Sequence, residues 1–504
     1  MNRPIKGLFW PSIAILLVSA ASMALEIIAG RALAPYVGMS LYTWTLIIAV
    51  VLAGLSLGNW IGGLLADRTD RPERIVAIGL IAAALTTLAS LYLLKAAAGW
   101  VDEGEPIQTI AILSMTAFFA PSAFAGALSP PLTIIALRNV GEERRGGVLG
   151  LMFALGALGA ILGTLIAGFV LISYLGTGYS VIAIAALYAV LSLRFWYAGR
   201  GIAASLVALL MVGGGAAYPQ VLHLSNSCDE ESRYFCIRVD DFGDGARPMR
   251  IMALDHLVHG VNDKADPQLL WSPYVHGVDE LIAARFPGDQ LSAFFIGGGA
   301  YTLPRAWAAR YPAGAFTIAE LDPEVTEQAR RALWFAPDQR TILLHGDARR
   351  LLQAMPPTAK FDVVFGDAFH DIAIPQHLVT DEFHAEVAKR LRPKGVYALN
   401  VVDGLRQPRF LISLATTLQA QFAHVELWLD IEAVQPQDAR TTWIVLASDQ
   451  PTGVRQFSAT RGFQRDWVQI PLEDMKRVVG DDQVVFLSDD FAPVDRLLAQ
   501  VSSD

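Results

Sequence analysis

The chain has few charged residues and few cysteines, and each shortage excludes a class of protein. Only 17% of its 504 residues are charged, whereas about a quarter is usual in a soluble domain. The net charge is −9 and no basic stripe with interleaved aromatic residues is present, which excludes a nucleic-acid-binding protein. The two cysteines, Cys228 and Cys236, are spaced neither as a zinc site nor as a redox CxxC motif.

Apolar residues are abundant instead, and they lie almost wholly before about residue 217. This distribution predicts a multi-span α-helical membrane bundle over residues 1–218, with the lipid bilayer as its partner, followed by a water-soluble part. The first span is too long for a standard cleaved signal peptide. Seven stretches have the length of membrane spans, near 9–30, 41–65, 75–95, 107–137, 147–173, 177–195 and 201–218.

Glu26 is the one acidic residue well inside a predicted span, and ionisable residues within membranes are candidates for function. Arg31 follows five residues later, so the two side chains could instead pair or reach the interface. Gly54, Gly58 and Gly62 recur every four residues, which favours close helix packing over a substrate path.

Basic residues gather in alternate loops, which indicates the orientation in the membrane. By the positive-inside rule, the N-terminus lies in the cytoplasm of a multi-pass cell (inner) membrane protein, and seven spans place the C-terminal domain outside. Cys228 and Cys236 would then lie in an oxidising compartment, where they form a disulfide or remain free thiols. The basic loops contain Arg3 and Lys6, Arg68, Arg71 and Arg74, Arg138, Arg144 and Arg145, and Arg194 and Arg200.

After a linker over 219–232, the sequence predicts a small β-hairpin subdomain within 233–285, with strands near 234–239 and 249–254. Strands and helices alternate through 286–450, which is typical of a parallel sheet covered on both faces. We expect an α/β class I methyltransferase-like (Rossmann-related) domain of seven strands, followed by a C-terminal tail over 451–504. Its strands lie near 292–296, 315–319, 341–344, 361–366 and 395–401, and two more, 424–430 and 441–447, pair antiparallel at one edge.

Candidate ligand-binding residues fall at the ends of these strands, where α/β folds bind ligands. Gly297-Gly298-Gly299 ends the first strand and allows a backbone turn to approach a nucleotide closely. Glu320 ends the second strand, about twenty residues on, where an acid can hold the two hydroxyls of a ribose. Asp347 and Asp367 follow the next two strands, so the three acids should face one crevice.

The C-terminal half resembles the spermidine synthases, which are polyamine aminopropyltransferases, from about Tyr234 to Asp430. The whole chain resembles bacterial proteins that fuse a multi-span membrane domain to this fold. The resemblance implies S-adenosylmethionine or decarboxylated S-adenosylmethionine as co-substrate, no metal, a polyamine or other amine as partner, and a dimer as in the soluble form of the fold. It rests on the hairpin and on the segments 296–299, 319–323, 345–348 and 361–367.

The resemblance also implies roles for single residues. Gly297 and Gly299 would line the turn, Glu320 would hold the ribose, and Asp347 and Ala348 would meet the adenine. Asp367 stands where the family has an acid that binds and deprotonates the attacking amine, a step that a nearby carboxylate can perform. Tyr274 lies in a segment like the family's substrate-side tyrosine region, and Asp371 is a further catalytic candidate.

The chain departs from the family's pattern on the amine side of the site. Ala300 stands where the family has an aspartate after the glycines. His370 occupies the second aspartate position after the fourth strand, and Asp371 comes one residue late. His256 and His259 follow the hairpin where the family has a glutamine. These histidines are candidate substrate-side residues, and their spacing matches no standard metal motif.

The sequence is compatible with three functions. The first is a membrane-anchored transferase that moves an aminopropyl group from an S-adenosylmethionine-type donor to a polyamine amine. The second is a polyamine or nucleoside transporter or sensor with a non-catalytic synthase-like domain, which seven spans favour because an anchor needs fewer. The third is an S-adenosylmethionine-dependent methyltransferase that acts on a membrane substrate.

Overall fold

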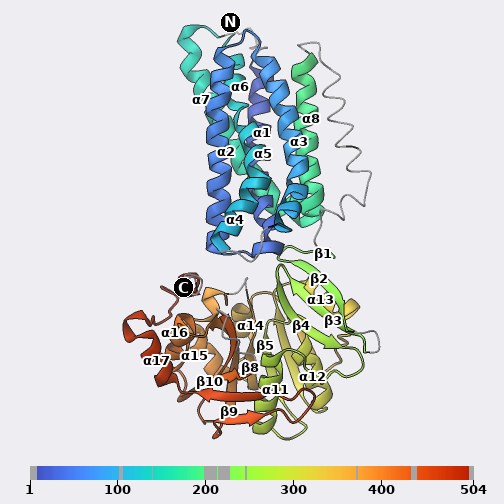
Figure 1. Cartoon of the computed structure of the whole chain (residues 1–504), viewed down its shortest axis with the longest axis vertical. Coiled ribbons are helices and arrows are strands. Elements are labelled where there is room, and N and C mark those ends of the chain that lie inside the picture. The colour runs from blue at the N-terminus through green and yellow to red at the C-terminus, as the bar shows by residue number, and fades with distance from the viewer. Residues whose placement is uncertain are drawn as a thin grey trace. The chain divides into compact units, whose positions relative to one another are not determined.

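The computed structural model describes residues 8–100, 106–138, 140–197, 213, 228–243, 247–369, 373–432 and 440–498. The chain divides into two compact units, Met1–Cys236 and Ile237–Asp504 (Figure 1). The first unit is helical and the second is built on sheets. The expected fold class, a bundle of long apolar helices followed by a methyltransferase-like α/β domain with a small N-terminal β subdomain, is confirmed.

Among the described residues of the first unit, five helical stretches have the length and apolar composition of membrane spans: Phe9–Val37, Leu41–Asp67, Pro72–Ala98, Ile107–Leu137 and Glu142–Trp196. The last one contains two of the expected spans, because Gly176, with φ 71°, separates α7 from α8. The expected span 201–218 lies outside the described residues, apart from residue 213. The helices are α1 (Phe9–Val37), α2 (Leu41–Asp67), α3 (Pro72–Ala98), α4 (Pro106–Ser114), α5 (Ala120–Gly126), α6 (Ser129–Leu137), α7 (Arg145–Ile166) and α8 (Gly176–Tyr197), with π-helical turns at Met115–Phe119 and Ala167–Leu175.

Glycines bring the helices of this unit into backbone contact. A Cβ atom on Gly58 would overlap the carbonyl oxygen of Ala123 in α5, and one on Gly163 would overlap that of Ala20 in α1. The helices can pack this closely only because these positions have no side chain. The prediction that Gly54, Gly58 and Gly62 serve helix packing is therefore confirmed.

The first sheet along the chain has four described strands in the order β1-β2-β3-β4. The prediction of a two-stranded hairpin was therefore incomplete. After β3 the chain reverses at Asp255, whose φ of 53° is unusual for a residue other than glycine, and β4 pairs antiparallel with β3. The turn has no glycine or proline, so the sequence did not signal the additional strand. The strands are β1 (Glu230–Glu231), β2 (Cys236–Phe242), β3 (Met249–Leu254) and β4 (Leu257–Asp263), and α11 (Pro273–Arg285) follows.

The main sheet has nine strands in the order β12-β13-β10-β11-β9-β8-β5-β6-β7. β9, β8, β5, β6 and β7 run parallel, and β10 and β11 pair antiparallel as expected. The chain passes from β5 to β6 and β7, and β8 then pairs with the other side of β5. This topological switch point between β5 and β8 is where such sheets bind ligands, outside the carboxyl ends of the strands. The strands are β5 (Ser292–Ile296), β6 (Ala315–Glu320), β7 (Thr341–His345), β8 (Phe361–Gly366), β9 (Leu391–Gly404), β10 (His424–Asp430), β11 (Arg440–Ser448), β12 (Gln456–Ser458) and β13 (Asp466–Ile470).

The segment 451–504, expected as a tail, contributes to this fold. Its strand β13 pairs with β10, so the sheet has nine strands rather than seven, and β10 and β11 are not at its edge. Leu472, Met475 and Val494 of this segment are buried in the hydrophobic core. The helices of the unit after α11 are α12 (Thr302–Arg310), α13 (Pro323–Ala332), α14 (Ala348–Ala354), α15 (Asp381–Arg390), α16 (Arg409–Leu418), α17 (Leu472–Val479) and α18 (Val494–Leu498).

Candidate active site

The glycine turn after β5 lies directly against the end of β8. Gly297 and Gly299 have φ values of 94° and 49°, in the region that favours glycine. A Cβ atom on Gly297 would lie 2.6 Å from the carbonyl oxygen of Asp367. The turn therefore needs glycine both for its conformation and for the close approach of the two strand ends.

Glu320, at the end of β6, is buried and bonds to this turn. Its Oε2 accepts hydrogen bonds from the backbone N–H groups of Gly298 at 2.7 Å and Gly299 at 3.3 Å, and its Oε1 accepts one from Asp322 N at 2.9 Å. Burial raises the pKa of Glu320, although these hydrogen bonds lower it. The structure thus brings together the turn and the acid that the sequence spacing predicted.

Tyr301, which follows Ala300, packs against the glycine turn. Its φ of 55° is left-handed, and its ring fills the space that a side chain on Gly298 would occupy. Its hydroxyl lies 2.6 Å from Thr326 Oγ1, and its ring stacks on Phe335 with centroids 4.1 Å apart. Ala300 is buried, and its carbonyl oxygen accepts a hydrogen bond from Asn262 Nδ2 at 2.8 Å. Both residues are thus part of the packing under the turn.

Asp367, at the end of β8, is held by two neutral side chains. Tyr274 donates its hydroxyl hydrogen to Oδ2 at 3.0 Å, and Asn400 Nδ2 donates to Oδ1 at 2.8 Å. Burial raises the pKa of Asp367 to about 6, against the effect of both hydrogen bonds. A carboxylate with this pKa can take up or release a proton near neutral pH. The structure therefore brings together Tyr274 and Asp367, and it adds Asn400, which the sequence reasoning missed.

A cavity of about 200 Å³ is lined by Tyr274 and by residues of β10, β11 and β13. Trp428 and Trp467 provide aromatic walls, Asp430 provides a carboxylate and Arg440 a guanidinium group. Tyr274 borders this cavity and also bonds to Asp367, so the cavity is next to the carboxylate. None of the four wall residues was predicted, although a polar residue at the end of an apolar strand, such as Asp430, is a signal of the kind that identified Glu320.

Of the two histidines predicted on the substrate side here, His259 lies against the glycine turn. His259, on β4, packs against Gly299, where an added Cβ would lie 3.5 Å from the His259 Cβ. Burial, with a smaller effect of His256, lowers the pKa of His259 to about 4, so this imidazole is neutral at physiological pH. Burial first, and then the charges of Arg238 and Arg440, lower the pKa of His256. His370 and Asp371 lie outside the described residues.

Asp347 caps a helix instead of bonding to the glycine turn. Its Oδ1 accepts the backbone N–H of Arg350 at 2.9 Å in the first turn of α14, where Ala348 is the first residue. Its Oδ2 lies 2.6 Å from His377 Nε2. These contacts fix the loop after β7, next to the end of β6. Among the described residues, no group of three His, Cys, Asp or Glu side chains could hold a metal ion.

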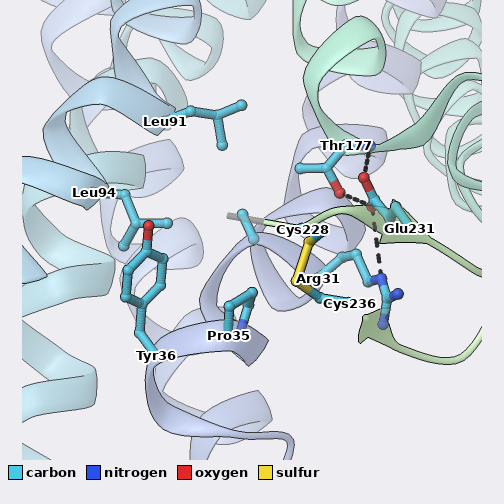
Figure 2. A pocket seen from close by; sticks show the side chains of 10 residues that line it. Arg31, Pro35, Tyr36, Leu91, Leu94, Thr177, Cys228, Glu231 and Cys236 are labelled. Carbon is cyan, nitrogen blue, oxygen red and sulfur yellow. Dashed lines mark hydrogen bonds and ion pairs between the residues drawn. A yellow bond between two sulfur atoms is a disulfide. The ribbon is translucent and has the colours of Figure 1, made fainter. Parts of the chain in front are cut away.

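The polar candidates of the first unit include Glu26 with its expected partner Arg31, and the two cysteines. Arg31 does not pair with Glu26. It donates from Nη1 to the carbonyl oxygen of Tyr234 at 2.5 Å, and its Nε lies 3.6 Å from Glu231 Oε1 (Figure 2). Glu231 Oε2 accepts the N–H of Thr177 at 2.8 Å, at the start of α8. Cys228 and Cys236 form a disulfide that closes this segment.

Comparison with known proteins gives two curated relatives. A polyamine aminopropyltransferase of Vibrio vulnificus is 35% identical over 138 residues, which are 27% of this chain and 46% of that protein. A probable polyamine aminopropyl transferase of Bifidobacterium longum is 32% identical over 124 residues, 24% of this chain and 27% of that protein. The chain thus spans less than half the length of either relative. No family model matches the chain.

Among solved structures, a probable spermidine synthase from Corynebacterium glutamicum is similar, with a TM-score of 0.43 and 21% identity. The match covers 51% of this chain and 94% of that one. Both curated relatives are named as polyamine aminopropyltransferases, the family that the glycine turn and the strand-end acids resemble. Over about a quarter of its length, the chain is therefore similar in sequence to polyamine aminopropyltransferases.

Proposed function

We propose that the second unit transfers an aminopropyl group from a decarboxylated S-adenosylmethionine-type donor to an amine. The donor would lie at the switch point between β5 and β8, with its ribose hydroxyls at Glu320 and its adenosyl part along the loop after β7. The backbone of the glycine turn would approach it closely, as at other nucleotide sites of this fold class. Support for this placement comes from Glu320, which is bonded to the turn and buried.

The acceptor amine would bind between Asp367 and the cavity beside Tyr274. Its nitrogen attacks the carbon next to the sulfonium, the carbon–sulfur bond breaks, and a neutral thioether leaves. The proton that the nitrogen loses passes to Asp367, whose carboxylate acts as general base. Tyr274 and Asn400 orient this carboxylate, because each donates to a different oxygen.

The observation that carries the proposal is this pairing of Asp367 with Tyr274 and Asn400 at the end of β8. A carboxyl group with a pKa near 6 is suited both to binding a cationic amine and to accepting its proton. Asp430 and the two tryptophans of the cavity suit the rest of a cationic, aliphatic chain, since a carboxylate attracts ammonium groups and aromatic faces attract cations.

Donor binding by the purified full-length chain tests the proposal. Isothermal titration with decarboxylated S-adenosylmethionine should give saturable binding, and Glu320→Ala should weaken it at least tenfold. Glu327→Ala, an exposed acid on α13, is the matched control and should bind as the wild type does. The absence of saturable binding of this donor to the folded wild-type protein would contradict the proposal.

A further inference from the structure

A cavity of about 210 Å³ lies within the helical unit, bordered by α1, α2, α5, α6 and α7. It is far larger than the roughly 15 Å³ that a single water needs on the same measure. Its walls are mostly apolar, but Ser19, Ser22, Asn59 and Ser129 place polar groups in it. Polar side chains at membrane depth are costly and generally face a functional space, so this cavity is suited to a ligand with a polar group.

Ser22 offers a hydrogen-bonding group to the cavity. Several other hydroxyls in this unit bond back to their own helix, as Ser122 does to the carbonyl oxygen of Phe118 at 2.8 Å. Ser22 Oγ is buried, with 6% of the residue exposed, and has no hydrogen-bond partner among the described residues. A ligand in the cavity could supply the partner that this oxygen lacks.

Glu26 continues the same face of α1 one turn beyond the cavity. Ser19, Ser22 and Met23 border the cavity, and Glu26 follows at the spacing of seven, four and three residues that places side chains on one helix face. Glu26 is 7% exposed, and its Oε2 has no hydrogen-bond partner among the described residues. Arg31, its expected partner, bonds to the segment around Glu231 instead.

We propose that Glu26 and this cavity form a binding site for a primary ammonium group. A buried carboxylate with no cation among its described neighbours favours a cationic ligand, and none of the described residues that border the cavity is basic. The ammonium would bond to the Glu26 carboxylate and to neutral acceptors such as the Ser22 hydroxyl, while methylene groups contact Ile15, Val18 and Leu132. The group could come from a free alkyl amine or from the headgroup of an aminophospholipid. This site lies in a different unit from the proposed transferase site and is independent of it.

The test uses the full chain in phosphatidylcholine nanodiscs with the Asp367→Asn substitution, which removes the carboxylate proposed to bind the attacking amine in the second unit. Equilibrium dialysis with labelled butane-1,4-diamine should show a saturable site that Glu26→Gln weakens at least tenfold. Gly156→Leu, which fills the cavity, should abolish it. The matched control is Glu73→Gln, because Glu73 pairs with Arg138 at the surface of the same unit and should not matter.

A second experiment distinguishes the two sources of the ammonium group, a free amine and a lipid headgroup. Nanodiscs that contain phosphatidylethanolamine should retain this lipid on the purified protein and lose diamine binding if the headgroup is the ligand, and Gly156→Leu should release the lipid. Diamine binding or specific lipid retention that depends on Glu26 supports the site. The proposal is overturned if the protein shows no saturable diamine binding and no lipid retention. It is also overturned if binding is unchanged by both Glu26→Gln and Gly156→Leu.

Discussion

Asp367 is the residue on which the proposed chemistry depends. Its neighbours are neutral hydrogen-bond donors rather than cations, so burial dominates and the pKa of Asp367 rises to about 6. An aspartate paired with an arginine would have a lowered pKa and would be a weaker base. The surroundings of Asp367 therefore favour proton transfer over a purely structural ion pair.

The pH dependence of aminopropyl transfer follows from this pKa. A general base works when it is deprotonated, so the rate at saturating donor should rise with pH, reach half its maximum near pH 6 and then level off. Initial rates between pH 5 and 8 measure this. Tyr274→Phe removes a hydrogen bond that lowers the pKa of Asp367, so the rise should shift to higher pH. Tyr311→Phe, a buried tyrosine at the end of α12, should leave the profile unchanged. A rate that falls across this range would refute the assignment.

Among single residues, those that belong to a sequence motif were predicted. Residues that only the fold places next to the candidate site were missed. Glu320 and Asp367 end apolar strands, and that pattern is visible in the chain. Asn400 lies in the middle of the apolar run of β9, where a lone polar residue was the only signal. Tyr301 could not be predicted as a support of the turn, because its left-handed conformation depends on packing against Thr326 and Phe335.

Among the elements, the turn between β5 and α12 should be the least tolerant of substitution. Gly297→Ala would place a Cβ 2.6 Å from the carbonyl oxygen of Asp367 and would strain a backbone at φ 94°. We expect a loss of about 1–3 kcal/mol of stability and at least tenfold weaker donor binding. Thermal unfolding and titration measure the two effects. Gly288→Ala is the matched control, because its added Cβ would meet no atom closer than 3.9 Å. Equal behaviour of the two variants would contradict this view of the turn.

The stability of the segment that ends the first unit should depend on the carboxylate of Glu231. This carboxylate accepts from the N-terminus of α8 and pairs with Arg31, and both side chains of the pair are 9% exposed (Figure 2). Glu231→Gln would remove a negative charge that faces the buried guanidinium of Arg31, at a cost of about 3 kcal/mol. The melting temperature of the purified chain in detergent should fall. Glu73→Gln removes only an exposed pair with Arg138 and should change stability by less than about 1 kcal/mol. A Glu231→Gln variant as stable as this control would contradict the expectation.

Element by element, strands flanked by helices were predicted closely, and the remaining strands were not. The limits of β5 and β8 match the apolar runs in the sequence, because parallel strands buried on both faces are continuous hydrophobic stretches. β4 follows a turn at Asp255 without glycine or proline. β12 and β13 are short and half-exposed, so their alternation is weak. β13 is a strand because it pairs with β10, and β12 in turn pairs with β13.

For the whole molecule, the charge pattern of the loops predicts that the second unit lies outside the cytoplasm. The disulfide between Cys228 and Cys236 allows a direct test. Intact cells treated with a membrane-impermeant reductant and then an impermeant maleimide should label both cysteines, which a mass shift on a gel reveals. Labelling only after lysis would show that the orientation is the reverse.

The sequence predicted the two-part organisation because apolar and polar residues separate along the chain, whereas contacts such as that of Arg31 with Glu231 depend on the fold.

The most direct measurement compares donor binding and transfer in one variant, Asp367→Asn, of the full-length chain. The amide keeps the shape of the carboxylate but cannot act as a base. Affinity for decarboxylated S-adenosylmethionine should stay within about threefold of the wild type, while transfer of its labelled aminopropyl group to a diamine should fall by about a hundredfold or more. Transfer at the wild-type rate in Asp367→Asn, or no transfer by the donor-bound wild-type protein to any amine, would contradict the proposed function.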